Sequence, residues 1–142
     1  MRAFTSETSS TLLRLPPGTD LLDGLTSAAK DREITAAWVN VIGAVRKLTF
    51  GFYDQETKEY TTLTHDGELE IASAMGNVSM KDGDPFVHLH VVCSGTDGRA
   101  IGGHLMPGTE VFVAEVLFQT FRGEGPVREQ DEDTGLALWP TD

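Results

Sequence analysis

The chain has 142 residues, 39% of them hydrophobic, and a formal net charge of −11 at pH 7. This length suits one domain and is too short for two full cores, and no apolar run approaches the roughly 20 residues that cross a bilayer. The 11 basic residues are scattered, whereas autonomous DNA binding needs clustered lysine and arginine, so we expect neither direct nucleic-acid binding nor attraction to anionic membranes.

The N-terminal part of the chain predicts a strand, a helix and a second strand. The first strand covers residues 10–15 and stops at Pro16-Pro17-Gly18, because proline neither donates to a ladder nor continues a helix. One residue of the pair Thr19-Asp20 then caps a helix that ends near Arg32. Residues 34–41 are apolar enough for a buried strand. The helix carries an amphipathic stripe made of Leu21, Leu22, Leu25, Ala28 and Ala29.

The middle of the chain predicts short strands separated by turns. Gly43 breaks the apolar pattern, and a new strand covers residues 45–53. After it we expect a polar turn, a short strand, a longer strand and a loop, at residues 54–59, 60–63, 69–78 and 80–85. His65 lies in the turn between the latter two strands and is expected to be a surface residue.

Three closely spaced strands follow, over residues 86–94, 99–106 and 110–121. The short connectors contain Thr96-Asp97-Gly98 and Pro107-Gly108, which is typical of antiparallel hairpins. One helix and about eight strands predict an α+β domain built on a mainly antiparallel sheet.

The composition changes after the last of these strands. We expect residues 1–122 to form the domain and residues 123–142 an acidic, glycine-containing tail, in which Leu136-Ala137-Leu138-Trp139 is a possible docking segment. A lone cysteine, Cys93, excludes an intramolecular disulfide and fits a reducing compartment. The polar N-terminus does not resemble a signal peptide, so a cytoplasmic protein is expected.

The most informative pattern is His-x-His on the strand 86–94. Side chains two apart on a strand share a face, so His88 and His90 point the same way. The opposite face is apolar and belongs to the core, with Val87, Leu89, Val91 and Cys93.

Whether His104 joins them depends on the hairpin register. A two-residue turn at Asp97-Gly98 puts His104 on the wrong face, whereas a three-residue loop ending in Gly98 pairs Gly95 with Arg99 and His90 with His104. Only the three-residue loop places the apolar residues of the second strand on the core face, because a one-residue slip exchanges the two faces. We therefore predict that the three histidines are neighbours.

Three neutral imidazoles converging on one point are typical of a divalent transition-metal site, with zinc as the commonest occupant and a fourth position open. We predict that His88, His90 and His104 are metal ligands, and that Gly102 and Gly103 leave space for a ligand or a neighbouring backbone. The competing interpretation is a set of half-buried histidines held by hydrogen bonds.

The chain resembles the PPC (plants and prokaryotes conserved) domain over nearly its whole length, up to about Phe121. Each matching stretch is weak by itself, but together and in this order they are specific. They are residues 15–22, Ile42-Gly43-Ala44-Val45, residues 67–71, His88-Leu89-His90 and residues 97–105.

The resemblance implies an antiparallel sheet flanked by helices and assembly as a homotrimer. In prokaryotic relatives the His-x-His and Gly-Gly-His elements look like a zinc site. In plant relatives the domain sits beside AT-hooks, which bind the DNA, while the domain itself mediates assembly and partner contacts. This sequence contains no AT-hook.

Two charged residues on apolar strands are further candidates. Arg14 is predicted either to bind an anionic ligand or to be an exposed strand residue or subunit salt bridge. Glu115 is a weak candidate for a general acid or base near the metal, and pairing with an arginine across a subunit interface fits it equally well. Cys93 falls on the core face and is expected to pack there.

These residues favour a trimeric metal-binding module that holds a small ligand or regulates a partner protein. The first alternative is a metal-dependent enzyme of unknown substrate, in which zinc polarises a carbonyl or activates water. The second is a DNA-associated regulator, suggested only by the plant branch of the family.

Overall fold

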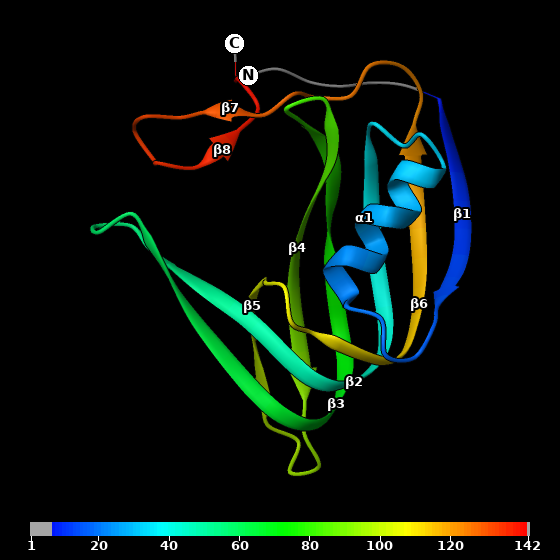
Figure 1. Ribbon diagram of the computed structural model, residues 1–142, viewed down its shortest axis with the longest axis vertical. Helices are drawn as coiled ribbons and strands as arrows, with labels where there is room; N and C mark the ends of the chain where they lie inside the picture. The colour runs from blue at the N-terminus through cyan, green and yellow to red at the C-terminus, as the bar shows by residue number, and fades with distance from the viewer. Residues whose placement is uncertain (1–6, 142) are drawn as a thin grey trace.

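One helix and eight strands follow one another along residues 7–141, the part of the chain that this computed structural model describes (Figure 1). No helix in that part is long and apolar enough to cross a membrane. The elements are β1 (Thr8–Leu15), α1 (Leu21–Asp31), β2 (Ala37–Asp54), β3 (Glu59–Lys81), β4 (Asp84–Ser94), β5 (Ala100–Leu105), β6 (Glu110–Phe121), β7 (Glu129–Gln130) and β8 (Ala137–Leu138).

Six strands form one antiparallel sheet in the order β1-β6-β2-β3-β4-β5. The far part of β2 also pairs with β5, at Phe50 and Gly51, so that strands β2 to β5 curl until they close on themselves. β7 and β8 form a separate two-stranded sheet in the tail. The predicted mainly antiparallel sheet is confirmed.

The single helix covers one face of the sheet, which we call the inner face (Figure 1). Asp20 caps it by accepting a hydrogen bond from the backbone N–H of Asp23 at 3.0 Å, and its second carboxylate oxygen accepts another from Gly108 N–H at 2.6 Å. The predicted stripe is buried except for half-buried Leu22. The family resemblance implied flanking helices, but the described chain contains only α1.

Gly43 does not end a strand, contrary to our expectation. β2 runs through it, and the register against β3 shifts between Val41 and Gly43. A Cβ at Gly43 would lie 2.0 Å from the carbonyl oxygen of Val113, and its φ is 140°. The glycine therefore marks a β-bulge where two backbones approach closely, which the same sequence signal also permits.

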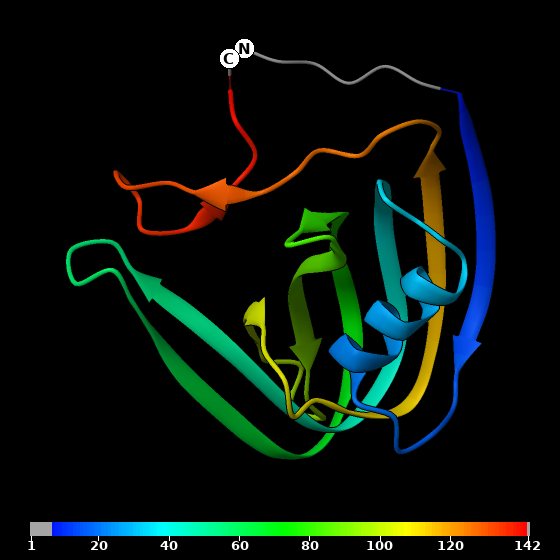
Figure 2. The same cartoon turned by 45° about the horizontal axis from the view of Figure 1, so that its top comes forward.

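The turn expected around His65 is also absent. β3 is one strand of 23 residues, and His65 pairs with Leu48 of β2 within a long hairpin. Pairing with the complete partner strand overrides the local turn preference of Asp66-Gly67. Figure 2 shows this β2–β3 hairpin projecting from the sheet toward the tail.

The face opposite α1, which we call the outer face, is organised in rows of register partners. One row crosses the whole sheet, because each residue pairs with the next on the neighbouring strand: Leu12, Leu117, Asn40, Met75, His90 and His104. A second row runs Ser10, Gln119, Trp38, Asn77 and His88. The outer face thus combines exposed apolar side chains with all three candidate ligands.

The close approach of β4 and β5 gives a test of this architecture. A Cβ at Gly102 would lie 2.0 Å from the carbonyl oxygen of Val91, so Gly102→Ala should force the two strands apart. We expect it to lower the free energy of unfolding by roughly 1–3 kcal/mol, measured by urea denaturation. Gly95→Ala is the control, since its Cβ would meet its nearest atoms at 3.5 and 3.6 Å, in ordinary contact. Equal stability of the two variants would contradict the strand spacing.

Candidate metal centre

The β4–β5 hairpin has the register predicted from its hydrophobic pattern. Gly95 N–H donates to the carbonyl of Arg99 at 3.2 Å, and Gly98 adopts a φ of 74° at the end of the loop. His90 is the register partner of His104. The three-residue loop and the pairing of the two histidines are confirmed.

His88, His90 and His104 converge on the outer face. One ligand atom from each can be chosen such that all three lie within 4.8 Å of one another. The ring centroids of His88 and His104 are 5.0 Å apart, and His90 lies 5.3 and 5.6 Å from them respectively. A metal ion bonds imidazole nitrogen at about 2.0–2.1 Å, so the three side chains could hold one ion.

The electrostatic state of the cluster suits metal binding. Burial, together with the smaller effect of neighbouring positive groups that include Arg128, lowers the pKa of His88 and of His104 to about 4. Both rings are therefore neutral near pH 7, with a lone pair available for a metal. No carboxylate belongs to this cluster among the described residues.

On one side the cluster is bordered by the β2–β3 hairpin. The ring of Tyr60 lies against that of His104, with centroids 5.0 Å apart. Gly51, the β2 partner of His104, has no side chain, and a Cβ there would lie 3.0 Å from the Tyr60 ring. The hairpin also contacts the tail, because Tyr53 donates to the carbonyl of Thr134 at 2.7 Å.

On the other side lies Arg128, a residue that the sequence analysis missed. It belongs to the tail, and its side chain runs into the sheet with only 7% exposure. Its Nε donates to Ser79 Oγ at 2.7 Å, its Nη1 to the Ala137 carbonyl at 2.8 Å and its Nη2 to Asn77 Oδ1 at 3.0 Å. The same Nη2 lies 3.5 Å from His88 Nδ1.

Two aromatic rings enclose the Arg128 guanidinium, Phe86 at 4.9 Å and Trp139 at 4.8 Å from its Cζ to the ring centroids. The one available sequence signal was that Arg128 is the sole basic residue in the acidic segment 123–142. Arg128 is far from the histidines along the chain, so no local sequence pattern indicates that it lies beside them. The segment that contains Ala137 and Trp139 thus contacts Arg128, whereas β8 pairs with β7 and not with the main sheet.

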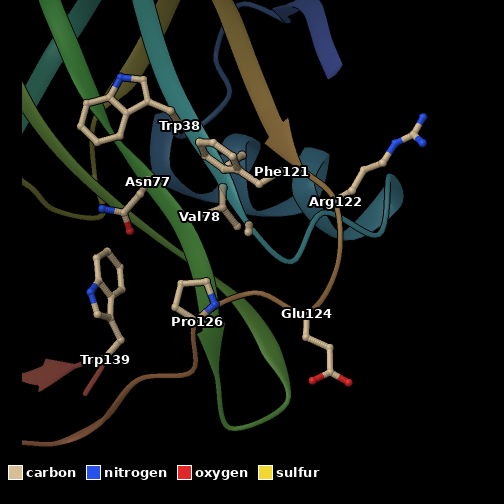
Figure 3. A pocket seen from close by; sticks show the side chains of 10 residues that line it. Trp38, Asn77, Val78, Phe121, Arg122, Glu124, Pro126 and Trp139 are labelled. Carbon is tan, nitrogen blue, oxygen red and sulfur yellow. The ribbon is translucent and has the colours of Figure 1, made fainter. Parts of the chain in front are cut away.

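A cavity of about 340 Å³ lies beside this arginine, between the tail and the sheet (Figure 3). Trp38, Phe121, Pro126 and Trp139 give it mainly apolar walls. Asn77 lines the cavity and also accepts the hydrogen bond from Arg128. Asn77 is the register partner of His88 on the adjacent strand, so the cavity adjoins the histidine cluster.

The other predicted residues lie elsewhere on the sheet. Arg14 and Glu115 are exposed register partners on β1 and β6. Glu115 is three strands from His90, roughly 14 Å at about 4.8 Å per strand. Within one chain the structure does not bring it to the histidines, so its role as an acid or base stays a prediction that requires a second copy.

The two glycines next to His104 face backbone. A Cβ at Gly102 would meet the Val91 carbonyl and one at Gly103 the Gly51 carbonyl, at 2.0 and 2.6 Å. The sequence predicted that these glycines leave space for a ligand or for a neighbouring backbone, and the structure places backbone there. Ligand binding by the two glycines stays a prediction. Cys93 is fully buried, and burial raises its thiol pKa to about 11.

Known proteins share both sequence and fold with this chain. A metal-containing protein from Archaeoglobus fulgidus is 46% identical, with a TM-score of 0.93 and 99% coverage of both chains. A plant- and prokaryote-conserved (PPC) protein from Pyrococcus horikoshii is 38% identical, with a TM-score of 0.92 and coverage of 99% of this chain and 97% of that one.

Among curated proteins, the bifunctional protein GlmU of Synechococcus sp. (strain JA-3-3Ab) is 33% identical over 125 residues, which are 87% of this chain but only 19% of that protein. The model of the Plants and Prokaryotes Conserved domain, abbreviated PCC or PPC, matches residues 2–122. The chain therefore belongs to the plants and prokaryotes conserved domain family.

Proposed function

We propose that this protein is a homotrimeric metal-binding module in which His88, His90 and His104 hold one divalent transition metal, with zinc as the resident ion. The convergence of three imidazoles, without a carboxylate in the described cluster, carries the proposal. Nitrogen ligands of this kind suit zinc, which keeps a fourth position for water or a ligand in such three-histidine sites. The metal-containing relative from Archaeoglobus fulgidus supports it further.

The same site supports binding of a small ligand more directly than catalysis. A bound metal would supply Lewis acidity at its open position. Catalysis also needs a group that transfers protons at the reacting atoms, and Glu115 lies three strands away on the same chain. A metal-dependent enzyme is therefore the second candidate function.

We infer that residues 1–122 carry the metal ligands and that residues 123–142 cover one side of the site.

The outer face supports the trimer, which the family resemblance implies. Leu12 and Ile42 are 79% and 57% exposed there, and Phe112, on the strand β6 that lies between theirs, is 51% exposed. Exposed apolar side chains gathered on one sheet face typically mark a contact between subunits. Arg14 and Glu115 border the same region, where they suit an ion pair between subunits as well as within one.

Metal content tests the site directly. Protein purified without chelators should contain close to one zinc per chain, and His104→Ala should lose it, because two imidazoles alone hold zinc weakly. His65→Ala is the matched control, since His65 is exposed and lies outside the cluster. The measurement is elemental analysis after dialysis. Wild-type protein that stays metal-free after zinc is added back would refute the site.

The lowered pKa values predict how the metal-free protein responds to acid. The unfolded chain protonates His88 and His104 near their ordinary pKa of 6.5, whereas the folded chain does so only near 4. The unfolded state therefore binds more protons in this window, and the free energy of unfolding falls as the pH is lowered from about 6.5 to about 4.

The check is a comparison of urea midpoints near pH 7 and near pH 5, with a chelator present. The wild-type protein should lose more stability between these two conditions than a variant with both residues changed, His88→Gln with His104→Gln. The same loss in both proteins would show that other groups cause the acid sensitivity.

Oligomeric mass tests the subunit contact. Ile42→Glu places a charge in the exposed apolar region and should lower the mass in light scattering from about three chains to one chain of 15.4 kDa. Ser27→Glu adds the same charge on the exposed side of α1 and should leave the mass unchanged. A monomeric wild-type protein would rule out the trimer.

A further inference from the structure

We propose that Arg128 is an anion-binding residue, and that the ligand of the metal site is an oxyanion that places one oxygen on the metal and another at the Arg128 guanidinium. The inference rests on the proposed metal site and names the class of ligand that it takes. Carboxylate and tetrahedral oxyanions share the required chemistry, because both present a pair of oxygens to a guanidinium.

The charge balance around Arg128 favours an anionic ligand. Arg128 is 7% exposed, and its hydrogen-bond acceptors are a hydroxyl, a carbonyl and an amide oxygen, all neutral. No carboxylate of the described residues forms an ion pair with it. An imidazole that binds a metal is an uncharged ligand, so a divalent ion held by the three histidines would keep its full charge. Metal and guanidinium together would form a cationic site, and a buried charge of this kind requires a counter-charge.

One guanidinium hydrogen of Arg128 would lose its acceptor when the metal binds. Nη2 of Arg128 carries two hydrogens; Asn77 Oδ1 accepts one at 3.0 Å, and His88 Nδ1 is 3.5 Å from the same nitrogen. A neutral histidine on a metal uses one ring nitrogen for the ion and carries a proton on the other. In either tautomer, Nδ1 of metal-bound His88 cannot accept from Arg128. Metal loading therefore leaves one guanidinium hydrogen directed at the site without an acceptor.

An oxyanion on the metal satisfies both requirements. It would neutralise part of the positive charge of the metal and the guanidinium. Its second oxygen would accept the hydrogen of Arg128 Nη2 that metal-bound His88 can no longer accept. The guanidinium is already held in place by Ser79, Ala137 and the rings of Phe86 and Trp139, so little conformational freedom is lost when the anion binds. The cavity beside Asn77 leaves room for the rest of a larger molecule.

The test uses cobalt as a visible probe of the metal site. Full-length protein is loaded with Co²⁺ and titrated with acetate in one arm and sulfate in the other, and the change in cobalt absorption gives an apparent Kd. We expect at least one anion to bind the wild-type protein. Arg128→Gln should weaken that binding about tenfold or more while cobalt stays bound, because a charged hydrogen bond is lost. The arm that responds identifies the oxyanion class.

Three further variants separate anion binding from tail packing. Arg128→Lys keeps the charge without the planar fork and should give an intermediate Kd. Arg99→Gln removes the same charge from an exposed loop position and should leave the Kd within about twofold. Trp139→Ala removes one of the two rings beside the guanidinium but keeps its charge and its hydrogen bonds, so it should weaken anion binding clearly less than Arg128→Gln does.

The outcomes that overturn the inference are distinct from failure of the metal site. If wild-type protein binds no cobalt, the proposed function and this inference both fall. If cobalt binds but neither anion perturbs it, or if Arg128→Gln leaves the Kd unchanged, only this inference falls. If Trp139→Ala weakens anion binding as much as Arg128→Gln does, the docked tail and not the guanidinium is responsible, and the role of Arg128 is refuted.

Discussion

The backbone pairing of His90 with His104 is the constraint on which the site depends. Because side chains alternate between faces, the register of one hairpin decides at once whether the histidines converge and whether the core is continuous. The same pairing buries Val91 and Cys93 on the inner face and leaves the histidines on the outer face. A slip by one residue would cost the core contacts of β4 or β5, so the energy of the core fixes the geometry of the polar cluster.

This coupling explains why sequence alone could place the three histidines. The loop glycine Gly98 and the apolar alternation of two adjacent strands are local signals, and both favoured one register. The strand boundaries were harder. Gly43 and Asp66-Gly67 resemble turns locally, but the structure uses the first as a bulge and pairs the second within a long hairpin. Only the partner strand distinguishes these outcomes, and its position is not a local property.

Arg128 could not be placed from sequence for a different reason. It lies 40 residues from His88 in a tail whose composition is acidic, and no periodic pattern links it to the sheet. Its position follows from contacts with Ser79 and Asn77, which are themselves ordinary polar residues of β3. Glu115 shows the converse, because its apolar neighbours suggested a role at the metal while the strand order separates it from the histidines. Strand order is a long-range property that hydrophobic pattern does not determine.

The cationic character of the site contrasts with the chain as a whole, which carries a net charge of −11. The net negative charge of the chain and the positive charge of the site are compatible, because their electrostatic effects act over different distances. Exposed charges are screened beyond about 8 Å at physiological salt, whereas a half-buried group interacts with its contact neighbours in a weaker dielectric. Net charge acts on long-range encounters, where we expect it to repel other anionic surfaces. Selection of a ligand at the histidines is governed instead by the groups in contact with them. Among residues 7–141, the charged group recorded in such a contact is the guanidinium of Arg128.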